Sequence, residues 1–242
     1  MHKKFCDCFE TCHANKKWHS EVKVHPDTQD RSSRAWENLQ VLIKEAANDQ
    51  REVFDPSKEL GSDDWSSIET LPAEISTLKH VKHLRVPGSS LTWIPPEIGD
   101  MEALEEFTPY TSYRLHWFPY EITKCRNLKK STISTRALYG NYKYRLPFPH
   151  LSASPVSLYK ERARCSVCDS STEKDDLNQV WLSMNVATDV VPLLAHTCSP
   201  ECLQQLPDGA DGYIKQPHQG GLGLEQPEKQ TFGGKTLEIP SR

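Results

Sequence analysis

The stretch VKHLRVPGSSLTWIPPEI (residues 81–98) carries the pattern that decides the fold, because the chain repeats it on both sides. Leu71, Ile94 and Phe118 are each followed by proline, and they lie 23 and 24 residues apart. Three further sets of positions keep the same register: Ile75, Ile98 and Ile122; Leu78, Met101 and Cys125; Val81, Leu104 and Leu128. A period of this length, held over three units, is typical of a stacked solenoid.

These units resemble the bacterial form of the leucine-rich repeat, whose unit has the pattern LxxLxxLxLxxNxLxxLPxxI. Residues 81–98 match it, with Ser89 at the position where that family prefers asparagine. The resemblance implies an α/β fold in which each unit has a short strand, a turn and a helical or irregular return. We therefore expect a short solenoid over residues 65–150, with Cys125 as a buried core residue and polar Ser131 at a core position.

In this family, the strand residues that alternate with the core positions face the concave side. Carried over to this chain, they form a strip where we expect a protein partner to bind. Its rows are His83, Glu106 and Lys130; Arg85, Thr108 and Thr132; and Pro87, Tyr110 and Ser134. The alternative is that these are solvated strand residues without a partner.

Trp93 and Trp117 occupy equivalent positions in adjacent units. Tryptophan is enriched at the energetic centres of interfaces, so both side chains are candidate partner contacts. The alternative is that the two rings pack on a flanking domain or on the prolines of the repeat. The sequence leaves both interpretations open.

A helix is expected before the repeats, as an N-terminal cap over residues 31–64. Its apolar residues lie at helical spacing in SRAWENLQVLIKEA (33–46). They are Trp36, Leu39, Leu42, Ile43 and Ala46. Asp55-Pro56-Ser57 predicts the start of a second short helix. The remaining parts are a Cys/His-rich segment at 1–30, a cysteine module at 160–207 and a Gly/Pro/Gln-rich tail at 208–242.

Composition excludes several classes of protein. The formal net charge of −4 argues against a general affinity for nucleic acid. No apolar run approaches the roughly 18 residues that span a bilayer. The N-terminus, MHKKFCDCFETCHANKK, lacks the apolar region of a secretory signal, so we expect a cytoplasmic protein. In that compartment, clustered cysteines more often bind metal than form disulfides.

Seven of the eight cysteines fall into two clusters, one near each end of the chain. The C-terminal cluster begins with a CxxC pair in RARCSVCDSS. Two strands are expected at 179–185 and 189–197, and a CxxxC pair follows in AHTCSPECLQQLP (195–207). Ser199 and Pro200 predict the start of a helix, whose first turn would favour the thiolate form of Cys202.

This order resembles the treble-clef zinc finger, in which the second half has a motif similar to CSPEC. The resemblance implies one structural Zn²⁺ bound by Cys165, Cys168, Cys198 and Cys202, with no open coordination position. His196 is a further candidate, either as a ligand in place of one thiolate or as a hydrogen-bond donor beside the site. Loss of Cys202 should then unfold the C-terminal part and leave the repeats largely folded.

The N-terminal cluster, FCDCFETCH, is a second candidate metal site. Its ligands would be Cys6, Cys8, Cys12 and His13. The alternative is a terminal segment with exposed thiols.

No catalytic motif is present, so we predict a non-enzymatic interaction protein that binds a protein partner. By analogy of fold, small bacterial proteins of this kind resemble immunity proteins that neutralise a toxin or effector, or regulatory adaptors. The competing interpretation is a zinc-finger protein that binds nucleic acid. It would use basic residues spread over the chain: Arg162, Arg164, Lys129 and Lys130.

Overall fold

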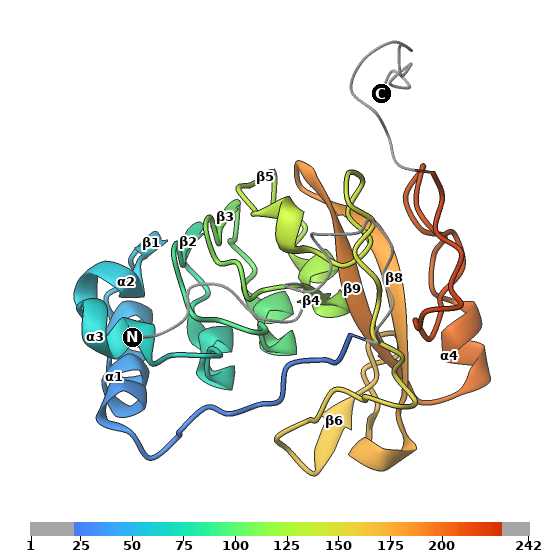
Figure 1. Cartoon of the computed structure of the whole chain (residues 1–242). Coiled ribbons are helices and arrows are strands. Elements are labelled where there is room, and N and C mark those ends of the chain that lie inside the picture. Colours follow the sequence, from blue (N-terminus) through green and yellow to red (C-terminus); the bar gives the residue numbers. More distant parts are fainter. Residues whose placement is uncertain (1–21, 229–242) are drawn as a thin grey trace.

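The computed structural model describes residues 22–228 as a mixed α/β fold (Figure 1). A parallel sheet has the order β1-β2-β3-β5, with α1 near its first strand and a long hairpin beyond its last. Its strands are short: β1 (Val53–Phe54), β2 (His83–Arg85), β3 (Glu106–Thr108) and β5 (Lys130–Ser131). No helix within 22–228 is long and apolar enough to cross a membrane.

Three successive units share one local design. Each strand position is preceded by a 3₁₀ helix: η2 (Ala73–Thr77), η3 (Pro96–Asp100) and η4 (Tyr120–Lys124). Pro72, Pro95 and Pro119 stand at the N-caps with φ between −73° and −68°. Proline fixes φ near this value and has no N–H to donate, so it ends the extended segment and begins the turn. The repeated proline therefore sets where each unit changes direction.

The in-register apolar positions of these units form one core. All of those predicted from the period are buried except Leu128, which is partly buried. Cys125 is 5% exposed, and its thiol donates to the Ile98 carbonyl oxygen at 3.1 Å. Burial, with a smaller contribution from Asp100, raises the pKa of this thiol to about 12. Cys125 is therefore a neutral core residue, as predicted.

The predicted helix before the repeats is α1 (Arg34–Asn48). The Ser33 side chain accepts a hydrogen bond from the Trp36 N–H at its N-terminus, which satisfies one of the free amides there. The five residues at helical spacing are all buried, and the helix packs against η2 and α3 (Ser62–Ser66). The second predicted helix is α2 (Pro56–Glu59), which begins directly after Asp55.

The two strands expected in the C-terminal part form the hairpin of β8 (Asn178–Val186) and β9 (Asp189–Thr197). The hairpin joins the repeats through β4 (Phe118–Pro119), which pairs in parallel with β9. Phe118 lies opposite Leu193 in this pairing. Val186, Val191 and Leu193 belong to the same apolar core as the repeat residues. The hairpin therefore covers the end of the third unit.

Ser131 explains how the hairpin tip attaches to the parallel sheet. Its backbone N–H donates to the Thr188 hydroxyl at 3.2 Å, and its own hydroxyl donates to Asp189 at 2.6 Å. The Thr188 hydroxyl donates to the Ser131 carbonyl at 2.9 Å. A polar residue stands at this core position because the next layer is the polar tip of the hairpin and not another repeat.

The rings of Trp117 and Trp93 pack on a flanking part of the chain, which is the second of the two interpretations given for them. Trp117 is 4% exposed, stacks on Trp93 at 6.5 Å between ring centroids, and meets Trp181 of β8 edge-on at 5.8 Å. Trp181 is fully buried, and its indole N–H donates to the Pro149 carbonyl at 3.0 Å. Large apolar rings take the most area out of water, so this aromatic core fastens the hairpin to the repeats.

Segments at both ends of the described chain lie along this aromatic core. Val22 and Val24 belong to it, as do residues from the loop that follows η5 (Thr135–Ala137). At the other end, His218 forms a backbone bridge with Trp181. Gly220 has φ +80°, and a Cβ there would meet the Pro149 carbonyl oxygen at 2.0 Å, so only glycine fits. Residues 208–228, expected as part of a tail, thus pack on the body.

We expect Trp117→Ala to destabilise the protein by about 3–5 kcal/mol, because it removes a buried ring between two other aromatic side chains. Tyr110→Ala is the matched control, since that ring is 54% exposed and should cost less than about 0.5 kcal/mol. Urea unfolding followed by circular dichroism measures both. Equal stability of the two variants would contradict the packing described for Trp117.

We expect the protein to lose stability in acid, because burial lowers the pKa of several of its histidines. Burial lowers the pKa of His116 to about 3, and of His25 and His218 to about 4. Imidazoles of the unfolded chain titrate near 6.5, so the unfolded state binds more protons below that pH. The free energy of unfolding should therefore fall as the pH is lowered from about 6.5 to about 4.

Urea unfolding of the His116→Gln variant tests this cause. Glutamine can replace the ring's 2.6 Å hydrogen bond to the Ala137 carbonyl but cannot take up a proton. The loss of stability between pH 7 and pH 4.5 should be smaller in this variant than in His80→Gln, which changes an exposed histidine. The same pH dependence in both variants would count against His116.

Candidate functional site

The first half of the cysteine cluster is a tight turn after β6 (Arg162–Arg164). The Cys165 N–H donates to the Ser170 carbonyl at 2.9 Å, and the Asp169 N–H donates to the Cys165 carbonyl at 3.0 Å. Asp169 has φ +60°, the left-handed conformation that closes such a turn. β7 (Ser171–Glu173) then pairs with β6, and η6 (Lys174–Asp176) leads into β8. The turn brings Cys165 and Cys168 close together.

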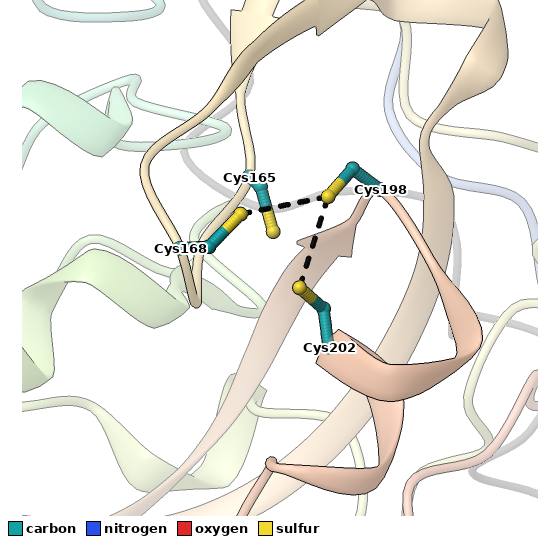
Figure 2. A group of neighbouring side chains, drawn as sticks. All are labelled: Cys165, Cys168, Cys198 and Cys202. Atoms are coloured by element: carbon teal, nitrogen blue, oxygen red, sulfur yellow. Dashed lines mark hydrogen bonds between the residues drawn. The ribbon is translucent and has the colours of Figure 1, made fainter.

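The second half lies at the end of the hairpin. Cys198 follows β9, and Cys202 lies in the first turn of α4 (Pro200–Gln204). The Ser199 hydroxyl accepts from the Cys202 N–H at 3.2 Å, and Pro200 occupies the first helical turn. The helix start predicted from CSPEC is thus confirmed, and it presents Cys202 toward the other thiols (Figure 2).

All four sulfur atoms lie within 4.8 Å of one another. Dashed lines in Figure 2 join the Cys198 sulfur to the sulfurs of Cys168 and Cys202, at 3.5 Å and 3.7 Å. A Zn²⁺ ion with four thiolates at about 2.3 Å has sulfur–sulfur edges of about 3.8 Å. The cluster therefore has the donor set and the spacing to hold a metal ion. Among residues 22–228, no other group of three or more potential metal ligands lies this close together.

Cys168 and Cys202 differ in the direction of their pKa shifts. A hydrogen bond with Ser170, followed by contacts with the other thiols, lowers the pKa of Cys168 to about 6. At Cys202 the hydrogen bond with Ser199 acts in the same direction, but burial and neighbouring thiols outweigh it and raise the pKa. The hydrogen bond at the helix start thus favours the thiolate of Cys202, as expected, but burial and the neighbouring thiols give a net shift of its pKa in the opposite direction.

His196 lies outside the cluster of sulfurs. β9 ends at Thr197, so the alternation that would place His196 beside Cys198 stops before Cys198. The His196 ring lies beside Gln179 of the neighbouring strand, with 3.3 Å between the two side-chain nitrogens. Its backbone, however, supports the turn: the His196 N–H donates to the Ser166 hydroxyl at 2.9 Å, and its carbonyl accepts from the Ser166 N–H at 2.7 Å.

Ion pairs tie the CxxC turn to the 3₁₀ helices of the repeats. Lys124 of η4 lies 2.6 Å from Asp169, and Arg164 of β6 lies 3.2 Å from Asp100 of η3. Sequence reasoning missed these contacts, because they join residues 45 and 64 positions apart. The N-terminal candidate site (Cys6, Cys8, Cys12 and His13) lies outside the described residues.

The strip expected on the sheet has its predicted register. His83 lies opposite Glu106, and Glu106 lies opposite Lys130. Arg85 lies opposite Thr108, while Thr132 follows the end of β5 and donates its N–H to the Phe107 carbonyl at 3.0 Å. These contacts place side chains from three units side by side on one face of the sheet.

Hydrogen bonds and charges connect the side chains of this strip. The His83 ring nitrogen Nε2 lies 2.8 Å from the Thr108 hydroxyl, and the Arg85 Nε donates to His83 at 3.2 Å. Burial, followed by the charge of Arg85, lowers the pKa of His83. Glu106 lies 3.5 Å from both Lys130 and His83. Tyr110 follows Thr108 by two residues in the chain and is 54% exposed.

The basic residues considered for nucleic-acid binding all face acidic side chains. Arg162 pairs with Glu173, and Arg164 pairs with Asp100. Lys129 and Lys130 lie 3.5 Å from Glu105 and Glu106. Their charges are thus balanced locally, so they form no continuous basic surface.

No family model and no curated protein matches the chain. Among solved structures, it is similar to the leucine-rich repeat domain of the type III effector XopL, at 17% identity and a TM-score of 0.33. The likeness covers 62% of this chain and 42% of that one, so the chain matches less than half the length of its structural neighbour. A likeness at this level carries no argument about function.

Proposed function

We propose that the chain is a non-enzymatic protein-interaction module of the leucine-rich-repeat type. In this proposal the segment 31–64 caps the first unit of a short solenoid, and the module at 160–207 closes the last. The burial of the in-register positions and the parallel pairing of their strands support it. The two ends of such a solenoid need covers, because each unit can bury its apolar face only against a neighbour.

The strip on the parallel sheet is the surface proposed to bind a protein partner. The observation that carries this proposal is the hydrogen-bonded network of His83, Arg85, Thr108 and Glu106, together with exposed Tyr110 and Lys130. Side chains already held in place lose little rotamer freedom on binding, so they lower the cost of association. Tyrosine is enriched among the residues that contribute most of the binding energy at interface centres.

The kind of partner follows only by analogy of fold. In a bacterial cytoplasm, a small interaction protein of this type would serve as an immunity protein against a toxin or effector, or as a regulatory adaptor. Neither role requires chemistry at the sheet surface, and both require a stable, specific complex with one protein.

We also propose that the four cysteines hold a structural Zn²⁺. The chain's own residues fit such an ion: four thiols converge from the CxxC turn, the end of β9 and the start of α4. A bound zinc would cross-link these three elements, with every coordination position filled by a protein ligand. Its contribution would be to the folding of the module and not to catalysis.

The partner surface can be tested by substitution on the sheet face. Tyr110→Ala and Lys130→Glu should each weaken binding to a protein co-purified from the native host by about 2 kcal/mol, or roughly thirtyfold. Val41→Ala is the matched control, because Val41 is an exposed apolar residue on α1, away from the strip. Titration calorimetry with the purified partner would contradict the proposal if all three variants bound equally well.

Cys202→Ser should remove the metal, because a hydroxyl is a poor substitute for a thiolate ligand. Mass spectrometry of the purified protein should find about one zinc per native chain and little in the variant. Cys125→Ala is the control, since that thiol lies in the repeat core and should leave the metal content unchanged. Unchanged zinc in both variants would exclude the cluster as the metal site.

The nucleic-acid alternative is tested by titration with duplex DNA and single-stranded RNA. Because the basic residues are paired with acids, we expect no binding that strengthens as salt is lowered from about 200 to 50 mM.

A further inference from the structure

A cavity of about 480 Å³ lies on the side of the repeats formed by the 3₁₀ helices. One wall is formed by η2, η3 and η4, and the opposite wall by the segment 158–171 together with the start of α1. Its volume falls within the range of small-molecule sites, about 300–1,000 Å³. The cavity contains none of the residues of the strip on the parallel sheet, so it is a separate candidate site.

Three glutamates line this cavity at the same position of each unit. Glu74, Glu97 and Glu121 each precede the buried isoleucine of their 3₁₀ helix, as in PAEI, PPEI and PYEI. The pattern was present in the sequence, but only the stacking of η2, η3 and η4 shows that the three side chains belong to one row. A row of like charges is unfavourable unless something balances it.

Glu121 is the most buried member of the row. It is 7% exposed, and its Oε2 has no hydrogen-bond partner among the residues at 22–228. Gly99 packs directly against it, since a Cβ at Gly99 would lie 2.6 Å from the Glu121 carbonyl oxygen and 2.9 Å from its Cβ. Burial raises the pKa of Glu121, a hydrogen bond with Ser166 and the charge of Lys124 oppose this shift, and the charge of Glu97 adds to it. A nearby cation would favour its ionised form.

The other charges of the cavity wall are already paired. Lys160 lies 2.8 Å from Glu97, and the pairs of Lys124 with Asp169 and Arg164 with Asp100 have been described. The remaining two cations have acidic partners outside the cavity: Arg31 pairs with Asp27, and Arg162 with Glu173. Among the described residues, the carboxylates of Glu74 and Glu121 are left without an ion-pair partner. The five cations that line the cavity thus all have acidic partners, and two carboxylates of the row remain unpaired within residues 22–228.

Aromatic rings complete the wall of the cavity, and two of them already contact a cationic side chain of this chain. Trp36, Trp93 and Tyr159 line the cavity. The guanidinium of Arg31 lies 4.0 Å from the ring centroid of Tyr159 and 5.5 Å from that of Trp36. Both are favourable cation–π distances. Two side chains that combine a cation with an apolar stem therefore already bind at this surface: Arg31 on the aromatic rings and Lys160 on Glu97.

We propose that the cavity binds a small organic cation with an apolar stem, an alkylguanidinium or alkylammonium group. The charge would pair with the uncompensated carboxylates of the row, and the stem would lie against the prolines and aromatic rings of the wall. The group could come from a free amine or from an arginine or lysine side chain of a protein. The proposal does not depend on the partner surface of the sheet.

Titration of the full chain with n-butylguanidinium tests the proposal, with n-butylurea as the neutral ligand of matched shape. We expect binding of the cation with a Kd on the order of 1 mM, at least tenfold tighter than the urea. Indole N–H signals of Trp36 and Trp93 in NMR spectra should shift with the cation. An arginine tripeptide and its citrulline counterpart distinguish the sources: tighter binding of the arginine peptide favours a protein side chain, and binding no tighter than butylguanidinium favours a free amine.

Two variants locate the cation. Glu121→Gln should weaken binding about fivefold or more, and Glu74→Gln about twofold, because each removes one carboxylate from the row. Glu74 is exposed, so Glu74→Gln should leave the fold intact and still tests the proposal if Glu121→Gln lowers the melting temperature. Glu102→Gln, an exposed carboxylate outside the cavity, should bind like the native chain. Equal affinity for butylguanidinium and butylurea, or unchanged affinity in both row variants, would overturn the proposal.

Discussion

The parallel pairing of β4 with β9 is the contact on which the rest of the structure depends. It places Phe118 beside Leu193 and lets the hairpin cover the apolar end of the third unit. The polar tip of the hairpin bonds to Ser131, and the aromatic core around Trp117 and Trp181 fastens its middle. A short stack of repeats leaves an apolar face at each end, and here a strand from another part of the chain covers one of them.

The features that repeat or follow local rules could be predicted from the sequence. The period of the apolar residues located the strands and the buried positions, and alternation set the register of His83, Glu106 and Lys130. The start of α4 followed from Ser199 and Pro200. The spacing of the four cysteines indicated one cluster, because a CxxC turn and a capped helix present thiols in few ways.

What could not be predicted depends on contacts between distant segments. Nothing local distinguishes a buried Trp117 from an exposed one, since the difference lies in Trp181, 64 positions later. His196 has the spacing of a ligand, but the end of β9 turns its ring toward Gln179. The sequence also did not show that Val191 and Leu193, which lie between the two pairs of cysteines, share the core of the repeats.

Two faces of the same stack thus carry different chemistry. The sheet face has a polar network and an exposed tyrosine. The face of the 3₁₀ helices has a row of glutamates in a cavity that is also lined by ion-paired side chains. The CxxC turn bonds to that second face through Lys124 and Asp100. A metal at the four cysteines would therefore act on the repeats through the hairpin and through these ion pairs.

Amide hydrogen exchange with and without a zinc chelator tests most directly whether the cysteine module and the end of the repeats are one folding unit. If β9 closes the stack, removal of the metal should abolish protection in β9 and in residues 118–122 together, while β2 keeps its protection. Loss of protection confined to residues 160–207, with residues 118–122 unchanged, would contradict the dependence of the third unit on the hairpin.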